Sequence, residues 1–393
     1  MSPVNNNETN WQTEKLLYDG DAFFEALFKD IENAHVSVDF ETYIFRDDLI
    51  GKRLVSALER TAARGVKVRL IVDGMGASGW FEKNAPLLEL KGVAVRIYHP
   101  VLFFNLWSRL KIDLGLDRPK IKIRGSAVIS RLNRRDHRKM CIIDNRIGYV
   151  GSVNVTAEHC LSIVGDRAWR DTSARVEEGP VPEMSVAFDD VWDRCHDAKA
   201  QPRWKERLTR TKSAYLFSRL LRFNHSSKLR NATFRALIKK ISGARERVYI
   251  TNPYFAPPRV LVRALKRASQ NGADVRVLVP RNSDVFFMPW VATAYYAVVL
   301  KGGGRIFEYL PRILHAKTAV IDDWVIVGSS NFNRRSLVHD FEVDIVLAQD
   351  ASRIELINTF HRDLKEAEEV QQCRGGLTSW VGRLISVVLK NWI

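Results

Sequence analysis

One sequence pattern occurs twice and constrains what this chain can fold into. The first copy, 137–144, reads His-Arg-Lys-Met-Cys-Ile-Ile-Asp and is followed by Gly-Ser-Val-Asn at 151–154. The second copy, 315–322, is followed by 328–331, so both copies read His-x-Lys-x4-Asp and then Gly-Ser-x-Asn. The apolar, β-branched run after each lysine predicts a buried strand, and the acidic pair that follows it predicts a turn. Each copy is therefore predicted to be a β-hairpin, with a shorter turn in the second copy, where one residue fewer precedes the glycine.

The residues at the open end of each hairpin suit the chemistry of a phosphate ester. Side chains alternate between the two faces of a strand, so a His and a Lys two positions apart point the same way. Lys is a compact cation for a phosphoryl oxygen, Ser and Asn donate hydrogen bonds, and imidazole can attack phosphorus or move a proton near neutral pH. Two imidazoles that face each other would act as nucleophile and general acid. The candidate residues are His137, Lys139, Asp144, Ser152 and Asn154 in the first copy, and His315, Lys317, Asp322, Ser329 and Asn331 in the second.

The order of predicted elements around the hairpins also repeats. The first half predicts a helix at 21–33, a strand at 36–40, a helix at 51–64 that ends at a glycine, and a strand at 66–73. The second half predicts the same order at 234–242, 247–251, 259–270 and 273–279. A strand–helix–strand unit implies a parallel pair of strands. Whole lobes are therefore predicted to be duplicated, and the fold class is α/β.

Together with residues 41–45, 252–255 and 328–337, the two motifs resemble the phospholipase D superfamily, and among its members the bacterial cardiolipin synthases without an N-terminal membrane anchor. The resemblance implies two α/β/α sandwich lobes related by a pseudo-twofold axis, with one active site at their interface and no metal or other cofactor. It also implies that Asp171 and Glu342, on the strands after the hairpins, hold the ring nitrogen of a catalytic histidine. Asp144 and Asp322 belong to the same motif but lie at predicted turns, so we expect them to give structural or electrostatic support.

The resemblance further implies an enzyme, a phosphatidyltransferase that forms a phosphatidyl-histidine intermediate. His137 would be the nucleophile, while His315 would protonate the departing alcohol and deprotonate the incoming one. With phosphatidylglycerol as the anionic substrate and a second phospholipid or alcohol as acceptor, the product is cardiolipin; with water it is phosphatidic acid, the product of a phospholipase D hydrolase. A metal-independent nuclease of the superfamily and a non-catalytic membrane scaffold are the alternatives. The identities of donor and acceptor and the oligomeric state stay open.

Composition limits the partner and the division into domains. The chain has 393 residues and a formal charge of +16, which predicts a polyanionic partner, either nucleic acid or an anionic membrane. Its four cysteines lack paired or metal-ligand spacing, which predicts reduced thiols. The predicted domains are a first lobe at 1–198 with an insertion at 98–136, a basic aromatic connector at 199–230, a second lobe at 231–370 and an amphipathic tail at 371–393.

Several segments favour a membrane as that partner. Val101–Trp107 is an apolar wedge beside many basic residues, and the tail places Trp and aliphatic residues at helical spacing. Both predict peripheral attachment to the cytoplasmic side of a bacterial cell membrane, although each could instead pack on the protein itself. Nucleic acid is disfavoured because it leaves these segments unexplained. The longest uncharged run, Val285–Leu300, is shorter than the roughly 20 residues that cross a bilayer, so it predicts a buried or interfacial helix.

Overall fold

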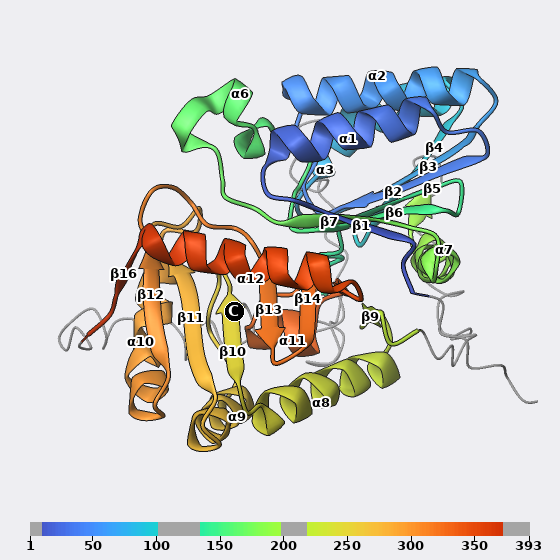
Figure 1. Ribbon diagram of the computed structural model, residues 1–393. Coiled ribbons are helices and arrows are strands. Elements are labelled where there is room, and N and C mark those ends of the chain that lie inside the picture. Colours follow the sequence, from blue (N-terminus) through green and yellow to red (C-terminus); the bar gives the residue numbers. More distant parts are fainter. Residues whose placement is uncertain (1–9, 101–133, 198–217, 372–393) are drawn as a thin grey trace, which may run out of the picture.

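The computed structural model describes residues 10–100, 134–197 and 218–371, which form two lobes of the same architecture (Figure 1). The predicted wedge Val101–Trp107, nearly all of the insertion, most of the connector and the tail beyond Gln371 lie outside the described residues. The first lobe contains β1 (Thr13–Leu17), α1 (Gly20–Glu32), β2 (Ser37–Thr42), α2 (Leu49–Ala63), β3 (Lys67–Asp73), α3 (Ser78–Leu90), β4 (Val93–Tyr98), β5 (Met140–Ile143), β6 (Ile147–Gly151), η1 (Ala157–His159), α6 (Leu161–Val164), η2 (Gly165–Arg167), β7 (Ser173–Glu177), α7 (Val181–Trp192) and β8 (His196–Asp197). The second lobe contains β9 (Leu221–Phe223), α8 (Ser227–Gly243), β10 (Arg247–Thr251), α9 (Arg259–Gln270), β11 (Asp274–Pro280), α10 (Met288–Lys301), β12 (Arg305–Tyr309), β13 (Thr318–Ile321), β14 (Trp324–Gly328), α11 (Arg334–Val338), β15 (Val343–Val346), α12 (Asp350–Lys365) and β16 (Ala367–Glu369).

Each lobe is built on an eight-stranded mixed sheet, and the two sheets have the same strand order. The first runs β1-β7-β6-β5-β2-β3-β4-β8, and the second, read in the equivalent direction, runs β9-β15-β14-β13-β10-β11-β12-β16. The strands β2, β3 and β4 pair in parallel, as do β10, β11 and β12. The predicted duplication of whole lobes is therefore confirmed, and so is the α/β class.

The predicted helices and strands are found with small shifts at their ends. Gly65 and Gly272, predicted to stop helices, have φ of +88° and +93°, a conformation that costs glycine little. The largest difference is at α8, which begins at Ser227 because the hydroxyl of Ser226 accepts a hydrogen bond from the Leu229 N–H at 3.2 Å. Strand β9 and the first turn of α8 thus lie within the predicted connector. Because β9 pairs with β15, elements of the second sheet begin before residue 231.

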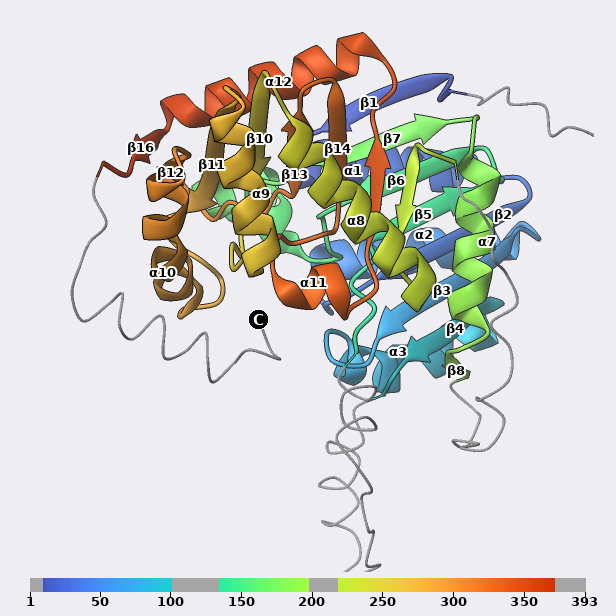
Figure 2. The ribbon, with the colours of Figure 1, turned by 90° about the horizontal axis from the view of Figure 1, so that it is seen from below.

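The core has three layers that follow from strand alternation. Helices α1, α2 and α3 cover the outer face of the first sheet, and α8, α9 and α10 cover the outer face of the second. Helices α7 and α12 pack on the shared core between the lobes (Figure 1), and the view from below shows them at different edges of the molecule (Figure 2). In β5, Met140 and Ile142 face this shared core, whereas Cys141 and Ile143 face the outer helices. The shared core includes residues of both sheets, so the lobes pack together through their inner faces.

Two equivalent backbone crossings join the lobes beside the motif histidines. The N–H of His137 donates to the Phe341 carbonyl at 2.9 Å, and the N–H of Phe341 donates to the Arg135 carbonyl at 2.9 Å. On the other side, the N–H of His315 donates to the Arg170 carbonyl at 2.8 Å, and the N–H of Arg170 donates to the Ile313 carbonyl at 2.8 Å. Each histidine backbone is therefore fixed to the residue that precedes a carboxylate of the opposite lobe.

The difference in spacing between the motifs is absorbed in the hairpin turns. Ile143 pairs with Ile147 across the first turn, and Ile321 pairs with Trp324 across the second, which leaves three turn residues in one and two in the other. Beyond the turns the registers agree, because Met140 pairs with Val150 as Thr318 pairs with Val327. The shorter second turn is as predicted, and both Gly-Ser-x-Asn segments begin at the same place.

The uncharged run Val285–Leu300 forms a short loop and nearly all of α10. Met288, Val291 and Val299 are buried against the lobe, whereas Phe286 and Trp290 are exposed. Among the described residues, none of the helices has both the length and the apolar character to cross a membrane. The run is thus a half-buried surface helix.

Candidate active site

The two motif histidines face carboxylates that come from the opposite lobe. In the first pair, Nδ1 of His137 lies 3.0 and 3.1 Å from the two oxygens of Glu342, just before β15. In the second, Nδ1 of His315 lies 3.3 Å from both oxygens of Asp171, just before β7. A carboxylate at Nδ1 fixes the ring orientation and leaves Nε2 as the nitrogen that can react. The structure thus places Asp171 and Glu342 against the histidines, crossed between the lobes.

The motif lysines lie beside their own histidines in the same way in both copies. The ammonium of Lys139 donates to the His137 carbonyl at 2.7 Å, and that of Lys317 donates to the His315 carbonyl at 2.5 Å. Both lysines are buried. Burial lowers the pKa of Lys139 to about 8, and burial together with the charge of Lys139 lowers that of Lys317 to about 7, although Asp171 opposes the shift. Lys317 and Lys139 therefore act on each other across the lobe interface, and an anion between them would relieve their repulsion.

Each histidine–lysine pair also has a tyrosine beside it. The Tyr43 ring lies 5.0 Å from the His137 ring and 5.3 Å from the Lys139 nitrogen. The Tyr254 ring lies 6.2 Å from the His315 ring and 5.8 Å from the Lys317 nitrogen. These residues lie just beyond β2 and β10, the equivalent parallel strands, so the carboxyl ends of those strands could have pointed to them.

The serines and asparagines of the Gly-Ser-x-Asn segments take separate roles. Ser152 donates its hydroxyl hydrogen bond to Asp171, and Ser329 donates to Glu342 at 2.5 Å. These serines were predicted to bind phosphate or to support the site, and in this geometry their hydroxyls orient the carboxylates. Asn154 accepts from the Ile44 N–H at 3.2 Å through Oδ1, which leaves its NH2 group as a donor. Oδ1 of buried Asn331 has no hydrogen-bond partner among the described residues, so this amide can orient toward a ligand.

The carboxyl groups of Glu342 and Asp171 are equally buried, but their pKa values are shifted in opposite directions. Burial raises the pKa of Glu342 to about 8, although Lys139 and the hydroxyl of Ser329 oppose the shift. Burial also opposes the charge on Asp171, but His315 and His159 outweigh it and hold the pKa of Asp171 well below its usual range. Asp171 therefore keeps its negative charge much more readily than Glu342 does.

The two histidines favour the neutral form and differ in their access to solvent. Burial and the charges of Lys139 and Lys317 lower the pKa of His137 well below its usual range. Burial and Lys317 lower the pKa of His315 to about 4, although Asp171 opposes this shift. The side chain of His137 is 13% exposed and that of His315 is 3% exposed. His137 is therefore the more accessible of the two imidazoles.

Asp144 and Asp322 lie at the far ends of their hairpins from the histidines. Asp144 accepts hydrogen bonds from the backbone N–H groups of 35–37 at 2.7–3.2 Å, and Asp322 accepts from those of 245–247 at 2.9–3.3 Å. These contacts tie each hairpin turn to the start of the neighbouring strand, β2 or β10. Their position supports the predicted structural role.

Two further residues of the first lobe have different counterparts in the second. Arg138, between the motif His and Lys, is fully buried and its Nη2 lies 2.6 Å from Glu41; its counterpart is Ala316. His159 contacts Asp171, with Nδ1 at 2.6 Å from Oδ2. Neither residue is among the candidates predicted from the sequence. A charged residue in a buried run could have flagged Arg138, whereas the place of His159 depends on how η1 folds back.

A metal ion could be considered at His159, Asp171 and His315, whose ligand atoms all lie within 4.8 Å of one another. The N–H of Asn154, however, donates to Nε2 of His159 at 3.2 Å. Nδ1 of His159 must then carry the ring proton, and it faces Asp171. That nitrogen has no lone pair for an ion, so the donor set fits a hydrogen-bond network better than a metal site.

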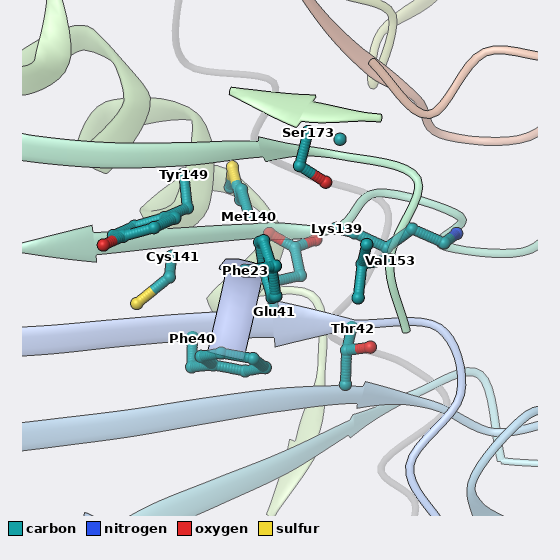
Figure 3. Close-up of a pocket in the computed structure, with 11 residues that line it drawn as sticks. Phe23, Phe40, Glu41, Thr42, Lys139, Met140, Cys141, Tyr149, Val153 and Ser173 are labelled. Carbon is teal, nitrogen blue, oxygen red and sulfur yellow. The ribbon is translucent and has the colours of Figure 1, made fainter. Parts of the chain in front are cut away.

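A small cavity inside the first lobe is separate from the paired histidines. It is lined by Phe23, Phe40, Glu41, Thr42, Lys139, Met140, Cys141, Tyr149, Gly151, Val153 and Ser173. Figure 3 shows the side chain of Lys139 leading out of it, with the nitrogen away from Glu41 and Ser173. The lysine thus leaves the apolar cavity and directs its charge toward the histidines, so the cavity is not where a phosphate would bind.

Comparison with known proteins gives consistent results. A family model described as "Cardiolipin synthase, PLD-like domain" matches residues 27–163 and 237–364. Cardiolipin synthase B of Salmonella typhi is 31% identical over 336 residues, covering 85% of this chain and 76% of that protein. Cardiolipin synthase of Clostridium perfringens is 28% identical over 380 residues, covering 93% and 74%. The crystal structure of phosphatidylserine synthase from Haemophilus influenzae Rd KW20 has a TM-score of 0.70 at 11% identity, covering 99% of this chain and 97% of that one, which shows a shared fold.

Proposed function

Because this chain belongs to the cardiolipin synthase family with a phospholipase D-like domain, we propose that this phosphatidyltransferase makes cardiolipin from phosphatidylglycerol and a second phospholipid or alcohol. The observation that carries the proposal is the pair of imidazoles, each held at Nδ1 by a carboxylate of the opposite lobe and each with a buried lysine beside it. Such a site can bind one phosphodiester anion and act on it from two sides.

The proposed reaction has two displacements. Nε2 of His137 attacks the lipid phosphorus, and His315 gives a proton to the departing alcohol. His315 then takes a proton from the incoming alcohol, whose oxygen displaces His137 from phosphorus. The anionic substrate adds a negative charge beside Lys317 and so raises the pKa of His315 toward neutral pH, which lets His315 carry the proton that it donates. Lys139 and Lys317 neutralise the charge that builds on the phosphoryl oxygens.

Peripheral contact with an anionic membrane forms part of the proposal. Phe286 is 76% exposed and Trp290 is 42% exposed, and their rings pack 6.1 Å apart. They lie close to Asp284, which accepts a hydrogen bond from the active-site Tyr254 at 2.5 Å. Uncharged aromatic side chains beside the site suit the headgroup layer, where a phospholipid substrate presents its phosphate. The net charge of +16 favours an anionic surface.

The test offers purified protein labelled phosphatidylglycerol in vesicles, and in a parallel reaction single-stranded DNA, with a chelator present. We expect cardiolipin and glycerol from the lipid and no cleavage of the DNA. His137→Ala and His315→Ala should each abolish turnover, and acid-quenched protein should carry a phosphatidyl group on the peptide that contains His137. His35→Ala, which changes an exposed imidazole beside the hairpin turn, serves as the matched control.

Each alternative has its own outcome. Phosphatidic acid as the main lipid product would identify a hydrolase, and DNA cleavage without lipid turnover would identify a nuclease. Full activity in either histidine variant would reject the paired-histidine mechanism.

A further inference from the structure

The two half-sites differ five residues after each motif asparagine. In the first lobe this position, after Asn154, is His159 at the end of η1; in the second lobe, after Asn331, it is Ser336 in α11. Each side chain reaches the carboxylate of its own lobe: His159 reaches Asp171 and Ser336 reaches Glu342. An imidazole and a hydroxyl therefore occupy equivalent places in otherwise matching networks.

His159 is held in one tautomer and one position. It is fully buried, and its Nε2 accepts the Asn154 N–H at 3.2 Å. Its Nδ1 consequently carries the proton and lies 2.6 Å from Oδ2 of Asp171. The Trp169 ring lies 5.0 Å from the His159 ring and 5.0 Å from the His315 ring, so both imidazoles pack against one indole. His159 cannot turn away from the carboxylate without losing these contacts.

We propose that His159 is a positioning residue that makes the half-sites chemically unequal. It keeps Asp171 an anion and thereby keeps His315 oriented, with Nε2 toward phosphorus, for the acid–base steps. His137, whose partner Glu342 lacks such an imidazole, is left to act as the nucleophile. The inference rests on the proposed function only in requiring that a phosphodiester be cleaved in two steps.

The second lobe supplies the internal comparison. Glu342, fully buried with serine hydroxyls and one imidazole, has a pKa raised to about 8, whereas Asp171, just as buried, has a pKa held well below its usual range. The other groups that face Asp171 are the hydroxyl of Ser152 and the ammonium groups of Lys317 and Lys139. Each has an equivalent near Glu342. Two differences remain: the second imidazole beside Asp171, and the charge of Asp340, which raises the pKa of Glu342 and has Trp169 as its counterpart.

The atoms balance in both steps. In the first step, the Nε2 lone pair of His137 forms the N–P bond, the P–O bond to the leaving alcohol breaks, and the Nε2 proton of His315 goes to that oxygen. In the second step, the incoming hydroxyl gives its proton back to Nε2 of His315, its oxygen forms the new P–O bond, and the N–P bond breaks. His315 can alternate in this way only while its Nδ1–H is bonded to an anion.

The test compares leaving groups. His159→Phe removes the donor, His159→Ser installs the group found in the second lobe, and His159→Asn places an amide N–H near the Nδ1 position. The substrates are a short-chain phosphatidic acid esterified with ethanol, which needs a proton to leave, and with p-nitrophenol, which does not. We expect His159→Phe and His159→Ser to lower turnover of the ethyl ester by roughly 10- to 100-fold, and that of the nitrophenyl ester by less than about 3-fold. His159→Asn should recover most of the loss.

The pH dependence of kcat/KM is a second, independent measurement. In His159→Phe the alkaline limb of kcat/KM for the ethyl ester should move to lower pH, because His315 loses its anionic partner. Equal losses on both esters, no loss on either, or an alkaline limb that moves to higher pH would overturn the proposal. Wild-type protein that cleaves the nitrophenyl ester but transfers nothing to a lipid acceptor would refute the proposed function. The His159 variants would still show whether His159 assists proton transfer in phosphodiester cleavage.

If the variants fail to fold, the wild-type protein still decides the matter. In protein labelled with 15N-histidine, NMR should show His159 as the Nδ1–H tautomer, and an Nε2–H tautomer would refute the proposal. Equilibrium dialysis against zinc provides the remaining check: one tightly held ion per chain would mean a metal site in place of the hydrogen-bond network.

Discussion

Asp144 is the third residue of the motif, and replacing it tests whether this residue supports the structure or takes part in catalysis. Its Oδ1 accepts the N–H groups of Val36 at 2.7 Å and Ser37 at 2.9 Å, and its Oδ2 accepts the N–H of His35 at 2.9 Å. The whole of β5 lies between this carboxylate and His137. We therefore expect Asp144→Ala to lower stability and to leave the turnover of the folded enzyme nearly unchanged.

The magnitude follows from the hydrogen bonds. Each of the three contributes about 0.7–1 kcal/mol net at a site that is partly open to solvent, so Asp144→Ala should cost about 2–3 kcal/mol. That corresponds to a fall in Tm of roughly 5–10 °C for a lobe of this size. Asp144→Asn keeps Oδ1 and suits the φ of +52° better than alanine does, so its cost should be about 1 kcal/mol. The ratio of the two costs tests the contacts themselves.

Urea unfolding and turnover per folded molecule are the two measurements, and Asp322→Ala is the replicate in the other lobe. Backbone N–H groups outweigh burial and lower the pKa of Asp144, so its contribution is present above the unfolded-state pKa of about 4 and is lost as pH falls through the folded-state pKa. The stability gap between wild type and Asp144→Ala should accordingly shrink in acid. A hundredfold loss of kcat at unchanged stability would refute this reasoning.

Three other changes test the electrostatics and the surface. The affinity for an inert anion such as tungstate should fall above about pH 7, where Lys317 loses its proton. Binding near neutral pH should therefore take up protons, which can be measured by calorimetry in buffers of different ionisation enthalpy. A constant affinity up to pH 9 would contradict the lowered pKa of Lys317. Glu342→Gln should keep kcat at pH 7 within about fivefold because burial favours the uncharged form of Glu342, whereas Asp171→Asn removes an anion and should cost at least about 100-fold. Equal losses in steady-state kinetics would show that the carboxylates are equivalent. Replacing Phe286 and Trp290 by serine should reduce sedimentation with anionic vesicles several-fold and leave turnover of a soluble short-chain substrate unchanged, and undiminished sedimentation would exclude this surface.

Much of the fold could be predicted because it depends on local patterns. Strand alternation puts His137 and Lys139 on one face, and the buried Arg138 between them points the other way to Glu41. Glycines after the helices and acidic residues at the turns mark the ends of elements by their own conformational preferences. Repetition of the whole order then predicted a second lobe, which the identical strand orders confirm.

The rest of the site could not be predicted, because it depends on which side chains meet once the strands and loops have packed. Ser152 and Ser329 have the chemistry to bind phosphate, but each lies just after a strand whose neighbour in the same sheet follows a carboxylate, and the hydroxyl donates to that carboxylate. His159 looks like any other histidine in the sequence until η1 folds back onto Asp171. No local pattern distinguishes a residue that completes such a network from one that merely lies near it.

The crossing of the carboxylates explains why the site needs both lobes. Glu342 belongs to the second lobe but holds His137 of the first, and Asp171 belongs to the first but holds His315 of the second. The backbone bridges lie at the same points, so an imidazole takes its position only when the opposite lobe is docked. One lobe alone would contain a histidine without its carboxylate and a carboxylate without its histidine. The reactive geometry is therefore a property of the interface, and any substitution that loosens the packing between the lobes should disturb both half-sites together.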